Sequence, residues 1–289
     1  MAAIIATTKN FLSLVKFSHT IFALPFAMIG FFSAVKLTES SFDIFLLAKV
    51  VLCMVFARSA AMAFNRYLDR QIDAKNPRTK IREIPSGIIT EKSALAFTIS
   101  NCILFVGTTF FINNLCFALS PVALAVVLGY SFTKRFTSLC HLVLGLGLSL
   151  APIGAYIAVS GSFALLPVLL SIVVLCWVSG FDIIYALQDE DFDKSENLFS
   201  IPVVFGKKGA LVISRILHTT CAVILLLIGS LFHFEMLYFV GTVLFIGLLI
   251  YQHSIVKPND LSKVNIAFFT TNGIASILYA VFYISNLYL

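Results

Sequence analysis

The decisive stretch of this sequence is DIFLLAKVVLCMVFARSAAMAFN at residues 43–65, followed at once by RYLDRQID at residues 66–73. The first part is apolar and long enough to cross a membrane, which takes about 20 mainly apolar residues. The second part brings two carboxylates to the end of that span. Ionisable groups at such a place are costly and commonly mark a functional site.

The rest of the chain repeats this apolar pattern. Of the 289 residues, 60% are hydrophobic and 12% are charged, whereas soluble domains have roughly 25% charged residues. Backbone groups in lipid must be satisfied within the segment, so such long apolar runs indicate helices. We predict an all-α integral membrane protein, a bundle of nine transmembrane helices forming one domain over residues 1–289. The predicted spans are 17–36, 43–65, 93–112, 117–133, 138–159, 164–188, 209–231, 234–253 and 264–287.

Lys and Arg collect on alternate connections between these spans. The connections after the third, fifth and seventh spans carry none, and those after the second, fourth, sixth and eighth spans do. Because Lys and Arg mark cytoplasmic loops, the N-terminus and these four basic connections are predicted to be cytoplasmic. Their basic residues are Arg70, Lys75, Arg78, Lys80, Arg82, Lys134, Arg135, Lys194, Lys207, Lys208, Lys257 and Lys263.

The end of the second span carries a first polar strip. Asn65, Asp69 and Asp73 lie four positions apart. At 3.6 residues per turn, positions four apart share one face of a helix. The three side chains are therefore predicted to form one strip, two turns tall.

The end of the sixth span carries a second strip. Asp182, Asp189 and Asp193 are spaced seven and four apart, which keeps them within roughly 40° on a continuous helix. Tyr185 joins this strip, four positions before Asp189. The spacing of Tyr185, Asp189 and Asp193 repeats that of the first strip, which suggests duplication of a four-helix unit. The two spans are four apart in order, so both strips are predicted to converge at the cytoplasmic face.

Aligned carboxylates need a compensating positive charge. They suit Mg²⁺, which proteins commonly hold through one or two carboxylates together with substrate phosphates. The neighbouring Lys and Arg side chains suit the remaining phosphate charge. A diphosphate with a hydrocarbon tail lying among the helices would fit this arrangement. Glu190, Asp191 and Glu196 are interpreted as solvated helix-end charges without such a role.

These motifs resemble a known family. Asn65-x₃-Asp69-x₃-Asp73, with Arg78 and the run from Arg82 to Gly87, is similar to the first signature of the UbiA-type aromatic prenyltransferases. The second strip, with Ser200-Ile201-Pro202 and Gly206, resembles their second signature. Tyr130-Ser131-x-Thr133-Lys134-Arg135 resembles the short motif between them.

The resemblance implies a nine-helix bundle with a central cavity, in a bacterial inner membrane, with its active site facing the cytoplasm. It implies transfer of a polyprenyl group from a polyprenyl diphosphate to an aromatic acid, with Mg²⁺ as cofactor and no nucleic-acid partner. The implied metal ligands are Asn65, Asp69 and Asp73 for one ion and Asp189 and Asp193 for a second. The implied diphosphate and reaction site contains Tyr130, Lys134, Arg135, Arg78, Arg82, Tyr185 and Asp182, and Asp182 is a candidate for deprotonating the phenol.

Arg58 lies seven residues before Asn65, on the same helix face, and is expected at the cavity. Two interpretations stay open: a direct contact with substrate, or an ion pair with Asp182 that only stabilises the fold. An aromatic carboxylate would suit the first.

The identity of the acceptor also stays open. The first span begins Lys16-Phe17-Ser18-His19-Thr20, where typical 4-hydroxybenzoate enzymes carry Arg-x-Asp-Lys-Pro. This version resembles the branch that prenylates 1,4-dihydroxy-6-naphthoate in menaquinone synthesis. We predict 4-hydroxybenzoate-type prenylation in respiratory quinone synthesis, with the naphthoate as the alternative and Lys16 and His19 as substrate-binding candidates. Structural hydrogen bonding is the other interpretation of His19 and of His141.

An ion-coupled transporter is the alternative from another class. Intramembrane carboxylates also mark ion paths. Transporters, however, place their ligands near the bilayer midplane, whereas these carboxylates gather at one face beside basic loops. The pattern therefore favours the enzyme.

Overall fold

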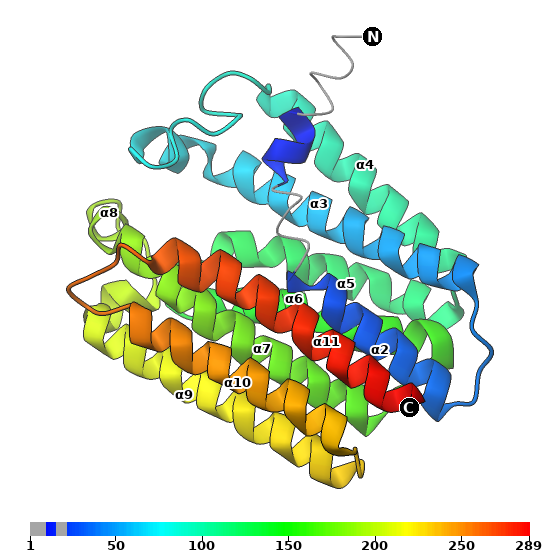
Figure 1. The fold of residues 1–289 in the computed structure, drawn as a ribbon. Helices are drawn as coiled ribbons and strands as arrows, with labels where there is room; N and C mark the ends of the chain where they lie inside the picture. The colour runs from blue at the N-terminus through cyan, green and yellow to red at the C-terminus, as the bar shows by residue number, and fades with distance from the viewer. Residues whose placement is uncertain (1–9, 16–21) are drawn as a thin grey trace.

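The computed structural model describes residues 10–15 and 22–289, and these residues are predominantly helical. The helices lie side by side as one bundle (Figure 1). They are α2 (Leu24–Leu37), α3 (Ile44–Lys75), α4 (Glu91–Phe110), α5 (Asn114–Thr133), α6 (Cys140–Ser160), α7 (Leu165–Ala186), η2 (Leu187–Asp189), α8 (Glu190–Ser195), α9 (Ile201–Leu231), α10 (Met236–Ile255), η3 (Ile266–Thr271) and α11 (Asn272–Tyr288).

The all-helical membrane fold predicted from the sequence is confirmed. Eight helical segments of the described chain are long and apolar enough to cross a membrane. The first predicted span, 17–36, corresponds to α2, which has 14 residues and is shorter than a full span. Residues 17–21 of that predicted span lie outside the described residues.

Helix α3 is longer than the membrane requires. Its 32 residues correspond to about 48 Å at 1.5 Å per residue, against about 30 Å of hydrocarbon. Asp43 starts the helix, because its side chain accepts a hydrogen bond from the N–H of Phe45 at 2.8 Å. Helix α3 is therefore long enough for its last turns, which carry Asp69 and Asp73, to extend beyond the hydrocarbon.

The core of the bundle is built around α7, which packs between α6 and α9. A Cβ on Gly145 of α6 would lie 2.2 Å from the Ser179 hydroxyl oxygen of α7, so the missing side chain permits this close approach. On the other side of α7, the Ser214 hydroxyl of α9 donates to the carbonyl oxygen of Gly180 at 2.7 Å. Trp177, on the same part of α7, is fully buried. The middle of α7 is thus fixed on both sides.

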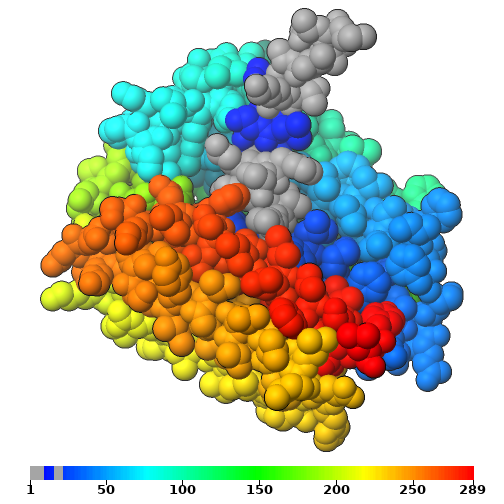
Figure 2. All heavy atoms as spheres, viewed as in Figure 1, coloured from blue at the N-terminus to red at the C-terminus, as the bar shows by residue number. Residues whose placement is uncertain are grey.

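The outer surface is apolar over long distances. Val243 and Ile250 of α10 are 64% and 66% exposed, and Val281 of α11 is 55% exposed. Figure 2 shows α10 and α11 forming one continuous surface on this face. Exposed aliphatic side chains of this kind suit contact with lipid tails. The chain is a multi-pass membrane protein.

One end of the bundle gathers the basic connections. Figure 1 shows the 76–90 loop after α3, the short helix α8, and the connection between α10 and η3 at the same end. The C-terminus lies at the opposite end. This agrees with the alternation of Lys and Arg along the sequence.

Candidate active site

The first polar strip lies at the end of α3 and is buried. Asp69 and Asp73 are 2% and 4% exposed. Asn65 donates through Nδ2 to Asp69 Oδ2 at 3.2 Å, so these side chains do share a face as their spacing predicts.

Basic side chains compensate both carboxylates. Lys134 Nζ lies 2.5 Å from Asp69 Oδ2, and Arg135 Nη2 lies 2.8 Å from Asp69 Oδ1. Arg82 Nη1 contacts both oxygens of Asp73, at 2.7 and 2.8 Å. Lys134 is the C-cap of α5, so the end of α5 is held against the end of α3 by charge.

The second strip is not the single continuous helix expected from the spacing. Helix α7 ends at Ala186, the chain tightens into the 3-10 turn η2, and α8 then runs from Glu190 to Ser195. The angular spread of roughly 40° expected for a continuous helix therefore does not apply between Asp182 and Asp193. A 3-10 turn has 3.0 residues per turn, so it redirects the side chains that follow it.

Tyr185 and Asp189 are nevertheless brought together by Arg78. Its Nε and Nη2 donate to the two oxygens of Asp189, at 3.0 and 2.5 Å, and its Nη1 donates to the Tyr185 hydroxyl at 3.1 Å. Burial lowers the pKa of the Arg78 guanidinium, but the hydrogen bonds and charge of Asp189 outweigh burial and raise the pKa overall. Arg78 stays charged.

These contacts join the two strips. Arg78 belongs to the loop that follows the first strip, and Asp189 belongs to the second. Asn76, in the same loop, donates to Asp189 at 3.4 Å, and Lys75 pairs with Glu196 at 2.6 Å. The spacing predicts that the strips meet. It cannot identify Asn76 as a hydrogen-bond donor to Asp189, because the conformation of the loop decides which of its residues reach Asp189.

Asp193 lies near the same cluster. The Ser200 side chain lies beside it, and the charges of Asp189, Lys134 and His141 act on it. Lys134, which pairs with Asp69, thus faces both strips.

Three interpretations made from the sequence differ from the structure. Asp182 pairs with His141, at 2.7 Å from Nδ1 to Oδ2, and not with Arg58. Glu190 is not a solvated helix end, because it is 7% exposed and pairs with Lys194. Glu196 likewise has a partner in Lys75. The partners of Asp182 and Glu196 lie 41 and 121 positions away and follow from helix packing, whereas Lys194 lies four positions from Glu190 on α8.

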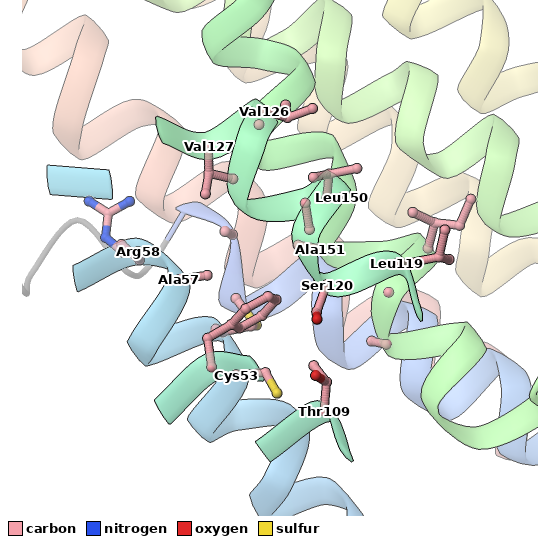
Figure 3. A pocket seen from close by; sticks show the side chains of 18 of the residues that line it. Cys53, Ala57, Arg58, Thr109, Leu119, Ser120, Val126, Val127, Leu150 and Ala151 are labelled. Carbon is pink, nitrogen blue, oxygen red and sulfur yellow. The ribbon is translucent and has the colours of Figure 1, made fainter. Parts of the chain in front are cut away.

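An apolar cavity of about 360 Å³ lies among α3, α5 and α6. Arg58 and Tyr130 are among its few polar lining residues. Figure 3 shows Arg58 at one edge, with Val126, Val127 and Leu150 among the apolar side chains around the space. The Arg58 Nε atom is buried and has no hydrogen-bond partner among the described residues. A half-buried guanidinium with an unpaired Nε atom beside an apolar cavity suits an anionic group on an otherwise apolar ligand.

The carboxylates fit a metal that substrate phosphates help to hold. In the part of the chain that the structure describes, no three His, Cys, Asp or Glu side chains are grouped to hold a metal by themselves. Mg²⁺ seldom needs such a group, because one or two carboxylates, water and phosphate oxygens complete its shell. The oxygen-only donors of both strips are compatible with that mode. Lys16 and His19 lie outside the described residues.

Comparison with known proteins decides the family. The model of the UbiA prenyltransferase family matches residues 23–274. The chain belongs to this family. A UbiA relative, the 4-hydroxybenzoate octaprenyltransferase of Aliivibrio fischeri (strain MJ11), is 30% identical over 238 residues, which cover 82% of this chain and 83% of the relative.

Solved structures share the UbiA fold. A UbiA homologue from Aeropyrum pernix K1 matches with a TM-score of 0.83 and 30% identity, over 91% of this chain and 96% of that one. A UbiA homologue from Archaeoglobus fulgidus, bound to GPP and Mg²⁺, matches with a TM-score of 0.78 and 20% identity, over 97% and 100% of the two chains. At that identity the second likeness concerns the fold alone.

Proposed function

We propose that this UbiA-family prenyltransferase transfers a polyprenyl group from a polyprenyl diphosphate to 4-hydroxybenzoate or a closely similar aromatic carboxylate, in respiratory quinone synthesis. The observation that carries the proposal is the joining of two carboxylate strips by Arg78, beside a cavity lined with apolar side chains. The names of the curated relatives support 4-hydroxybenzoate as the acceptor. The same site could take a dihydroxynaphthoate, which the experiment below distinguishes.

We propose that Asn65, Asp69 and Asp73 hold one Mg²⁺ and that Asp189 and Asp193 hold a second. The bound metal would stabilise negative charge on the leaving diphosphate. The side chains that now pair with these carboxylates would bind the phosphate oxygens: Arg78, Arg82, Lys134 and Arg135. The Archaeoglobus homologue, bound to GPP and Mg²⁺, is consistent with this assignment.

The residues of the chain then have distinct tasks. The C–O bond of the allylic diphosphate breaks with its electron pair on the diphosphate, and the ring carbon of the acceptor forms the new C–C bond. Lys134 and the arginines stabilise the departing charge. Tyr130 and Tyr185 line the reaction site, and Arg58 binds the carboxylate of the acceptor. The cavity holds the apolar tail and excludes water from the allylic cation.

We also propose that the protein lies in a bacterial inner membrane as one domain over residues 1–289. The N-terminus and the two joined strips face the cytoplasm. The positions of the Lys and Arg residues on alternate connections support this orientation.

An acceptor screen tests the proposal. Purified protein is mixed with Mg²⁺, a labelled polyprenyl diphosphate and, separately, 4-hydroxybenzoate, 1,4-dihydroxy-6-naphthoate or no acceptor. We expect a prenylated product from 4-hydroxybenzoate and none after chelation of the metal. Product from the naphthoate alone would place the enzyme in menaquinone synthesis. Absence of product and of diphosphate release with every acceptor would contradict the prenyltransferase assignment.

A further inference from the structure

A hydrogen-bonded pair, His141 of α6 and Asp182 of α7, lies beside the cluster that Arg78 joins. His141 Nδ1 lies 2.7 Å from Asp182 Oδ2, and the two side chains are 5% and 21% exposed. Asp182 precedes Tyr185 by three positions on the same helix, about one turn away. The pair is therefore within about one helical turn of Tyr185, which Arg78 contacts.

A third helix fixes the proton on the imidazole. The backbone N–H of Ile201 donates to His141 Nε2 at 3.4 Å. Ile201 is the first residue of α9, and the first N–H groups of a helix have no partner within it. Because Nε2 accepts this hydrogen bond, the neutral ring carries its proton on Nδ1 and donates it to Asp182.

Asp182 differs from Asp69, Asp73 and Asp189 in what its oxygens contact. Both oxygens of Asp69, of Asp73 and of Asp189 contact cationic side chains. Asp182 Oδ2 is held by His141, whereas no hydrogen bond to Oδ1 occurs within residues 10–15 and 22–289. Since the Asp182 side chain keeps a fifth of its surface accessible, Oδ1 is available to a ligand.

The surrounding packing keeps this pair in place. The Ser179 hydroxyl of α7 donates to the carbonyl oxygen of His141 at 3.1 Å. This contact lies at the close approach of α6 and α7 that Gly145 permits. Residues held by packing and hydrogen bonds on rigid elements are the ones that orient a reacting group.

We propose that His141 is a positioning residue that holds Asp182 with Oδ1 free to accept the phenolic proton of the aromatic acceptor. The inference rests on the proposed function, because it needs a phenolic acceptor. The acceptor O–H bond breaks with its electron pair on oxygen, and the proton binds Oδ1. The C–O bond to diphosphate breaks with its electron pair on the diphosphate, and the more nucleophilic ring attacks the allylic cation that this leaves. The alkylated ring carbon loses its proton to the released diphosphate, and Asp182 returns the first proton to the phenolate.

Two substitutions at the same position separate positioning from folding. His141→Leu keeps a side chain of similar size without a donor. His141→Gln keeps both a donor for Asp182 and an acceptor for the Ile201 N–H. His253→Leu is the matched control, because it removes a partly buried imidazole in α10 outside the proposed site.

We expect His141→Leu to lower kcat about 100-fold, the cost of misplacing a reacting group by about 1 Å. The KM for polyprenyl diphosphate should change less than twofold, and His141→Gln should restore most of kcat. The loss should shrink as the pH rises from about 7 towards 10, because the phenol of the acceptor, with an ordinary pKa near 10, then ionises without a base. The control should keep the activity of the unmodified protein.

Each other result has a defined meaning. Equal losses in His141→Leu and His141→Gln with no recovery at high pH, or full activity in His141→Leu, would overturn the positioning role. If His141→Leu cannot be extracted folded, His141→Asn replaces it, because its shorter side chain cannot bridge both partners. A wild-type protein that prenylates no phenolic acceptor contradicts the proposed function itself, before any variant is compared.

Discussion

Replacing Asp69 by Asn tests the charge on the first strip with little change in shape. The Asp69 side chain is 3% exposed and lies between Lys134 and Arg135. An amide of the same size keeps the packing and one acceptor oxygen. It removes the negative charge that both cations neutralise.

The magnitude follows from these contacts. Hydrogen bonds to charged groups contribute about 1.5–3 kcal/mol each, but Lys134 and Arg135 are 30% exposed, so water replaces part of the lost interaction. We therefore expect the free energy of unfolding to fall by only about 1–2 kcal/mol. Activity should fall much further. A metal contributes several kcal/mol of transition-state stabilisation, and about 4 kcal/mol corresponds to a loss near 10³-fold in kcat.

The assay is Mg²⁺-dependent prenylation in detergent, measured beside thermal denaturation. Asp191→Asn is the matched control, because it makes the same change in α8, where Asp191 is exposed and carries no assigned ligand role. The control should keep full activity. An Asp69→Asn protein that retains more than a tenth of wild-type kcat, or a control that loses as much, would refute the proposed role of Asp69.

Three further changes test other parts of the site. Arg78→Gln removes the ion pair with Asp189; we expect kcat/KM for polyprenyl diphosphate to fall about 10- to 100-fold, and an unchanged value would contradict the joining of the strips. Arg58→Leu should raise the KM for the aromatic acid about 10- to 100-fold and change the KM for polyprenyl diphosphate less than twofold. A change in the KM for polyprenyl diphosphate alone would argue against carboxylate binding by Arg58. Gly145→Ala places a Cβ 2.7 Å from a backbone carbonyl oxygen, so thermal denaturation should show a loss of roughly 1–3 kcal/mol. Gly107→Ala, which meets nothing within 4 Å, is its control and should not destabilise the protein.

The helical membrane fold could be predicted because hydrophobicity is a property of each segment alone. The span predicted at 93–112 corresponds to α4 (Glu91–Phe110), and that predicted at 234–253 corresponds to α10 (Met236–Ile255). The shared face of Asn65 and Asp69 could also be predicted, from their spacing of four residues. Within a regular helix, spacing alone determines the face on which a side chain lies.

The second strip shows where this reasoning stops. Its spacing equals that of the first strip, yet η2 interrupts the helix at Leu187–Asp189, while α3 continues to Lys75. Periodicity cannot distinguish a 3-10 turn from an α-turn over three residues. The partner of Asp182 could not be predicted from the sequence either, because His141 lies 41 positions away on another helix.

The balance of charge explains why we propose a metal together with the diphosphate. Four cationic side chains face four of the carboxylates of the two strips, with Asp182 left to pair with His141, so the cluster is already near neutral. A bare diphosphate would add several negative charges to a largely buried site, where unpaired charge is costly. A diphosphate that brings Mg²⁺ adds little net charge, and the cations can exchange carboxylate oxygens for phosphate oxygens. Specific binding of the metal-bound diphosphate then follows from the composition of the cluster: Asp69, Asp73, Asp189 and Asp193 with Arg78, Arg82, Lys134 and Arg135.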